Sequence, residues 1–179
     1  MDNIKEKLYQ QLAIDYCCPV SDIKDKKNHF TEYEKREGRR QFEEADECIL
    51  KVIVVNGKLV FTGKKQVVDV CSQKFSDKSG SWFMDVSNFR ELDEILAGEG
   101  YQIKTVHPFF IPKDHHVCDM NGIEGKKYNQ EEILQFQGDD RFDEAFCFDE
   151  NSPDVLAVAA IIDYEIVGMA GASADSPYF

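Results

Sequence analysis

The sequence predicts a mixed α/β (α+β) fold in two units, and three observations lead to this prediction. Of the 179 residues, 42% are hydrophobic and 31% are charged, a globular composition with enough apolar side chains for a core. Helical and β-rich stretches alternate in residues 1–112, as expected where helices and a sheet are interleaved. Residues 113–125 lack periodicity and contain two glycines, which indicates a linker. Residues 126–179 predict a second unit that is incomplete.

The first unit is expected to begin with a helix followed by a long polar excursion. Apolar residues four apart indicate one face of a helix over residues 4–16, namely Ile4, Leu8, Leu12 and Tyr16. The excursion spans residues 19–45 and contains the chain's one basic cluster, Arg36, Arg39 and Arg40. This cluster either binds an anion such as phosphate or pairs with Glu43 and Glu44, and pairing is the interpretation we favour.

A β-hairpin and a helix are expected next. Residues 48–55 are a β-rich run, Asn56 and Gly57 form the strongest two-residue hairpin signal, and residues 58–62 form the returning strand. A helix over about residues 64–75 follows. One side of this helix carries Val67, Val68, Cys71 and Phe75.

Two strands and one helix complete the predicted first unit. Residues 81–86 predict a short strand, and Ser87 is a suitable N-cap for the helix after it. That helix carries Phe89, Leu92, Ile95 and Leu96, and glycines 98 and 100 end it. Residues 101–111 are expected to form a further strand.

The second unit is predicted to contain two short helices and one hairpin. Asn129 caps the first helix, and Asp139 with Asp140 begins the second. Two strands over residues 155–162 and 165–173 follow the break at Pro153. An isolated hairpin is marginal in water, and its last strand is small and apolar, so we expect that strand inside a larger sheet. Its unpaired edge would otherwise invite pairing, including a homo-oligomer formed through this strand.

Charge and cysteine usage restrict the partners and the compartment. The 21 basic and 34 acidic residues give a formal net charge of -13. Such a surface repels phosphate backbones and anionic lipid, so neither nucleic acid nor membrane is an expected partner, whereas cationic amines are weakly attracted. The charged N-terminal stretch does not resemble a signal peptide, and the six cysteines contain no CxxC pair, so reduced thiols in the cytoplasm are expected.

Two segments of the second unit carry a family resemblance. The stretch DVLAVAAIIDYEIVGMAGASADSP resembles the hairpin of the second and third strands in the GCN5-related N-acetyltransferase (GNAT) superfamily. The preceding NQEEILQFQGDDRFDEAFCFD resembles the first two helices of that fold, which lie over the acceptor site. The first unit resembles the N-terminal extension of a bacterial subgroup, in LAIDYCC, ECILKVIVVNGKLVFTG and HPFFIP.

The resemblance implies an acyltransferase that moves acetyl from acetyl-CoA to an amine. In the family, the following strand and a Gly-rich turn at a helix N-terminus bind the pyrophosphate of the cofactor. The chain is expected to stop before this loop, so it is truncated relative to the family, binds no acetyl-CoA alone and is inactive alone. Gly168 to Gly171 do not replace the loop, because they lie in a strand pattern and no helix follows them.

Asp139, Asp140 and Arg141 are the candidate acceptor-binding residues, because the resemblance places them at the helix turn facing the acceptor. Their carboxylates would recognise a cationic amine. The simpler interpretation, which we favour, is a capped helix start, since Asp is common at N-cap positions. No general base or acid is assigned.

Other candidate sites have simpler structural interpretations. His115, His116, Cys118 and Asp119 contain metal-ligating side chains, but their spacing favours a solvated linker and no metal site is expected. Cys17 and Cys18 are interpreted as buried thiols rather than a redox pair, and His107 as a polar residue at a strand end. The aromatic group formed by Phe136, Phe142, Phe146 and Phe148 is expected in the core.

Two functions therefore remain open at this point. The first is the N-terminal portion of a GNAT-like N-acetyltransferase, and the second is a non-catalytic interaction module that pairs through its exposed C-terminal hairpin. The acceptor amine and the oligomeric state are left open.

Overall fold

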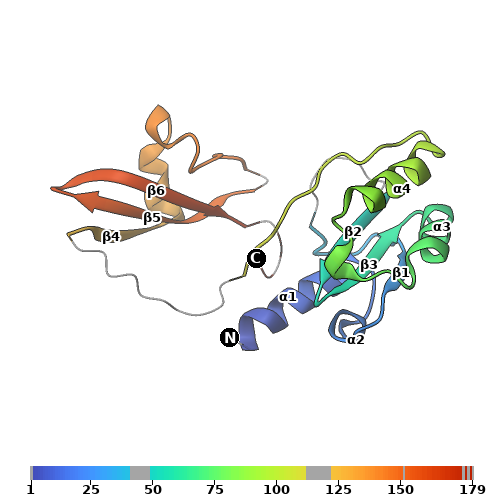
Figure 1. Ribbon diagram of the computed structural model, residues 1–179. Coiled ribbons are helices and arrows are strands. Elements are labelled where there is room, and N and C mark those ends of the chain that lie inside the picture. Colours follow the sequence, from blue (N-terminus) through green and yellow to red (C-terminus); the bar gives the residue numbers. More distant parts are fainter. Residues whose placement is uncertain are drawn as a thin grey trace. The chain divides into compact units, whose positions relative to one another are not determined.

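The computed structural model describes residues 2–40, 49–111, 122–150, 152–174, 176 and 178 (Figure 1). The chain divides into two compact units near residue 113, and each is described by itself. Both units combine helices with a sheet, which confirms the predicted α+β class.

A three-stranded sheet with helices on both faces forms the first unit (Figure 1). Strands β1 (His29–Glu32), β2 (Leu50–Val55) and β3 (Lys58–Gly63) lie in the order β1-β3-β2. Strand β1 is parallel to β3, and β2 is antiparallel to it. The helices are α1 (Asp2–Asp15), α2 (Val20–Lys24), α3 (Lys65–Phe75) and α4 (Val86–Ala97).

Alternation along β3 separates two core layers. Val60 packs with residues of α1 and α2, whereas Leu59 and Phe61 pack with residues of α3 and α4. The predicted β2–β3 hairpin is confirmed, and both turn residues have positive φ, 52° at Asn56 and 78° at Gly57. The helices predicted over residues 4–16 and 64–75 are confirmed as α1 and α3.

Three predictions for the first unit are wrong. The polar stretch over residues 19–45 contains the regular elements α2 and β1. Strand β1 has one apolar residue, Phe30, and forms because it pairs with β3. Residues 81–86 form no strand; the chain makes a 3-10 turn, η1 (Gly80–Trp82), and α4 begins after an Asp85 N-cap. Residues 101–111 have no regular secondary structure.

Close backbone contact explains the turn at η1. The Gly80 amide donates to the Gly57 carbonyl at 3.0 Å, and a Cβ on Gly80 would lie 2.7 Å from the Gly57 backbone. A side chain at residue 80 has no room there, so glycine allows the chain to cross the hairpin turn and then enter α4.

An antiparallel sheet, ordered β4-β5-β6, forms the second unit (Figure 1). Its strands are β4 (Glu124–Asn129), β5 (Asp154–Ile162) and β6 (Glu165–Ser173). Between β4 and β5 lie α5 (Gln130–Ile133), η2 (Leu134–Phe136) and η3 (Asp140–Phe142). Asp163 and Tyr164, with φ of 49° and 68°, make the tight β5–β6 turn. The predicted aromatic core is present: Phe136, Phe142 and Phe146 are buried, and Phe148 packs against them.

The described sheet corrects the expected strands of the second unit. The hairpin has a third strand, β4, part of which was expected in the linker over residues 113–125. Tyr128 is the one buried residue of β4, so neither alternation nor an apolar run reveals the strand. Among the described residues β6 pairs with β5 alone, so its expected unpaired edge is present, and its place inside a larger sheet stays a prediction.

Candidate functional site

A depression of about 400 Å³ lies between the η3 region and β6. One side is formed by Arg141, Phe142, Glu144 and Ala145, and the other by Ile166, Val167, Gly168 and Met169. Phe142 is buried in the aromatic core, so the charged residues beside it are carried on an anchored turn. The depression therefore combines an apolar β6 wall with charged groups at its rim.

Asp139 is the N-cap of η3 and is bonded to Arg141. Its carboxylate accepts from the Arg141 amide at 3.2 Å, from Arg141 Nε at 3.0 Å and from Nη2 at 2.6 Å. These side-chain bonds hold the pKa of Asp139 below its usual range and raise the pKa of Arg141. The structure thus shows the cap that was the simpler interpretation of Asp139.

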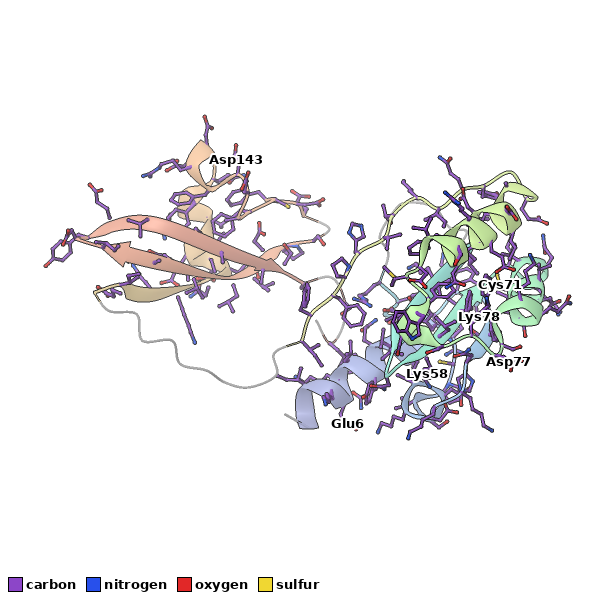
Figure 2. The ribbon with its side chains drawn as sticks, viewed as in Figure 1. Glu6, Lys58, Cys71, Asp77, Lys78 and Asp143 are labelled. Atoms are coloured by element: carbon purple, nitrogen blue, oxygen red, sulfur yellow. The ribbon has the colours of Figure 1, made fainter. Side chains whose placement is uncertain are left out.

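Acidic groups around Arg141 remain available for a cation. Glu165 contributes to raising the pKa of Arg141, after the larger effect of Asp139. Asp140, Asp143 and Glu144 are exposed and form no ion pair with another described residue; Figure 2 labels Asp143. Because Asp139 already balances Arg141, the rim is net negative and suits an ammonium group.

Buried Asp154 ties the segment after η3 to the C-terminal end of β6. Its carboxylate accepts from the Cys147 amide at 3.2 Å, the Phe148 amide at 2.9 Å and the Ser173 hydroxyl at 3.0 Å. The residue is 6% exposed. Asp154 is not among the residues predicted from the sequence. The pattern that could have revealed it is an acidic residue at the start of an apolar strand, DVLAVAAII.

Gly171 allows the same segment to touch β6. A Cβ at this position would overlap the Ala145 carbonyl oxygen and would lie 3.1 Å from Phe146 Cδ1. The η3 region and the hairpin are therefore in direct backbone contact, and the depression lies at the open end of this contact.

The arginine cluster is paired within the first unit. Arg40 Nε lies 2.6 Å from the buried Asp15 carboxylate, and Arg36 lies 3.2 Å from Glu34. Arg39 stacks on the Tyr33 ring at 4.0 Å. The predicted partners, Glu43 and Glu44, lie outside the described residues.

The remaining candidates are Cys17, Cys18, His107 and the segment around His115. Cys17 and Cys18 are buried free thiols, and burial raises the pKa of Cys18 to about 11. His107 is exposed in the segment without regular structure. His115, His116, Cys118 and Asp119, for which a solvated linker is the favoured interpretation, lie outside the described residues. Within the described ranges, no group of three His, Cys, Asp or Glu side chains could hold a metal ion.

No family model matches the chain, and no curated protein or solved structure is significantly similar to it. Across the part of the chain that the structure describes, every helix is too short or too polar to cross a membrane.

Proposed function

We propose that the second unit is the acceptor side of a GNAT-like N-acetyltransferase that transfers acetyl from acetyl-CoA to an amine. The observation that carries this proposal is the order of its elements: β4, helical turns over one sheet face, and then the β5–β6 hairpin. If β5 and β6 correspond to the second and third strands of the family, one strand should precede them. Strand β4 is such a strand.

The two edges of the sheet differ in a way that supports further pairing at β6. Strand β4 exposes Lys126 and Lys127, and edge lysines discourage strand addition. Between Ile166 and Ala172, β6 contains neither charge nor proline and includes two glycines. The β6 edge is therefore the one suited to a further strand, as the family resemblance implies.

We infer that the acetyl-CoA site of the proposed enzyme lies outside these residues. Phosphate groups need converging backbone amides, commonly at a helix N-terminus. Gly168 and Gly171 lie within β6, paired with β5, and no described helix follows them. The proposal therefore places every coenzyme contact outside the described residues.

What these residues contribute is recognition of the acceptor. An amine is an ammonium ion at neutral pH. The Glu144 carboxylate in the depression, and that of Glu165 next to the lining residue Ile166, would attract and orient it beside Arg141. The amine must lose a proton before it attacks a thioester, and a base in the complete enzyme would take that proton. Reduced thiols and a cytoplasmic location accompany this proposal, in keeping with the free cysteines 17, 18, 71 and 147.

The test uses the product of the complete coding region that contains these residues. Release of free coenzyme A is measured with acetyl-CoA and a panel of polyamines and lysine peptides. We expect Glu144→Gln with Glu165→Gln to raise KM for the amine about tenfold while kcat changes less. Glu131→Gln, on exposed α5, is the matched control. If the wild-type product releases no coenzyme A in response to any amine of the panel, the proposal is refuted.

An interaction module is the second candidate, and the uncharged β6 edge favours it. In this case β6 pairs with β6 of a second copy, which extends the sheet across a two-fold axis. Light scattering during size exclusion separates the two candidates. A dimer that is abolished by Ala170→Pro in β6, together with no acetyl transfer, would support the module; a strict monomer would exclude this pairing.

A further inference from the structure

Three loops of the first unit line a shallow, open hollow of about 440 Å³ at one end of its sheet. They are the loop between α2 and β1, the β2–β3 turn and the loop after α3. The lining residues are Lys26, Lys27, Asn28, Gly57, Ser76, Asp77, Lys78 and Ser79. Figure 2 labels Asp77 and Lys78 on the loop after α3.

Asn28 ties these loops together. Its side-chain Nδ2 donates to the carbonyl oxygens of Phe75 at 3.0 Å, Ser76 at 3.0 Å and Lys78 at 2.8 Å. Its Oδ1 accepts from the Leu59 amide at 2.9 Å. With the Gly80–Gly57 hydrogen bond described above, the backbone around the hollow is held without any ligand, so binding would not have to order it.

Three of the lining side chains are lysines without a carboxylate partner. Lys26, Lys27 and Lys78 are exposed, and none forms an ion pair with another described residue. Asp77 is the one carboxylate in the lining, so the hollow is net positive in a chain of net charge -13.

Apart from Asp77, the acceptors next to these lysines are already occupied. The carbonyl groups at the end of α3 accept from Asn28. The Asp25 carboxylate, beside Lys26, accepts from Lys58 at 2.7 Å and from His29 at 2.9 Å. Asp77 carries one negative charge against three positive ones, so the lining keeps excess ammonium donors for a ligand.

We propose that this hollow binds a small, multiply charged oxyanion such as a phosphoryl or diphosphate group. Ammonium groups and the hydroxyls of Ser76 and Ser79 are the donors such an anion needs. The lining contains no aromatic ring and no apolar wall, so it offers nothing for a nucleobase to stack on. This site is in the first unit and does not depend on the proposed acetyltransferase activity.

The test is a calorimetric titration of the whole 179-residue chain with inorganic pyrophosphate at low ionic strength. We expect saturable binding with Kd of about 1 mM or tighter, weakening as salt is added. The variant Lys26→Gln/Lys27→Gln/Lys78→Gln should bind at least about tenfold more weakly, the combined effect of three exposed charges. These side chains are exposed, so folding should be unaffected, as circular dichroism can verify.

A matched variant removes the same charge elsewhere. Lys5→Gln/Lys7→Gln/Lys127→Gln replaces three exposed lysines outside the hollow and should change Kd by less than about twofold. Equal weakening in both variants would show diffuse attraction and would overturn the proposal. Absence of saturable binding up to about 10 mM pyrophosphate would overturn it as well.

Discussion

The Lys58 ammonium group donates to the Asp25 carboxylate at 2.7 Å, although the Lys58 side chain is 2% exposed and that of Asp25 is 37% exposed. Lys58 also donates to the Asp22 carbonyl, and Asp25 accepts from His29 Nε2 at 2.9 Å. The first residue of β3 thereby binds the end of α2 and the start of β1. This arrangement explains how a polar stretch folds onto the sheet.

Asp25 should make the first unit sensitive to acid. Hydrogen bonds from Lys58, and then from His29, hold the pKa of Asp25 well below its ordinary value of 3.8. Because the pKa of Asp25 is lower in the folded state, the charged carboxylate stabilises the fold fully at pH values above its unfolded-state pKa. This stabilisation is lost as the pH falls towards and through the folded-state pKa. Asp25→Asn should reduce the free energy of unfolding at neutral pH and flatten its decline below about pH 4.

Urea unfolding followed by Trp82 fluorescence at a series of pH values measures this difference. Asp69→Asn is the control, because Asp69 forms an exposed pair with Lys65 and should change stability less than Asp25→Asn does. Parallel pH profiles for wild type and Asp25→Asn would contradict the role of the Lys58–Asp25 bond.

Two glycines in β6 provide a matched test of the second unit. Gly171→Ala should destabilise this unit by about 2 kcal/mol or more, because the new Cβ would overlap the Ala145 carbonyl. Gly168→Ala should be tolerated, since its Cβ would lie 3.8 Å from Ala160 Cβ, an ordinary contact. Amide hydrogen exchange in β5 reports both effects, and equal exchange rates in the two variants would argue against the close contact.

Asn129 should stabilise the start of α5 through a capping box. Its side chain accepts from the Glu132 amide at 3.0 Å, and Glu132 accepts from the Asn129 amide at 2.9 Å. We expect Asn129→Ala to cost about 1 kcal/mol, measured by exchange of the α5 and β5 amides. Glu131→Ala in the same turn leaves the capping box intact and should destabilise the unit less than Asn129→Ala does. A larger loss of stability in Glu131→Ala would be evidence against the cap.

Thiol reactivity should separate exposed from buried cysteines. Burial raises the pKa of Cys71 to about 12 and that of Cys18 to about 11, whereas Cys147 is exposed. Mass-spectrometric mapping after brief alkylation at pH 8 should find Cys147 modified, and Cys18 and Cys71 protected until urea is added. Rapid labelling of Cys71 in the native chain would contradict its place in the core.

The elements that the sequence predicts well are those whose signal is local. Asn56 and Gly57 specify a turn by their own backbone preferences, and Asn129 specifies a helix start by its side chain. Strands β1 and β4 were missed because each has a single strongly apolar residue, Phe30 or Tyr128, and exists through pairing with a neighbour distant in sequence. Long-range pairing leaves no such local signal.

The candidate sites show the same division. The sequence predicts the Asp139 cap as the favoured interpretation, because an N-cap is local. The contacts of Asp154 and the grouping of Lys26, Lys27 and Lys78 were not foreseen, because each joins segments separated along the chain.

One titration tests the central proposal most directly. Acetyl-CoA is added to the 179-residue chain and to the complete product, meaning the longer protein that the acetyltransferase proposal requires. Both carry Lys26→Gln/Lys27→Gln/Lys78→Gln so that binding in the hollow does not contribute. We predict micromolar binding by the complete product and none in that range by the 179 residues. Equal micromolar binding by both proteins, or none by the complete product, would contradict the account.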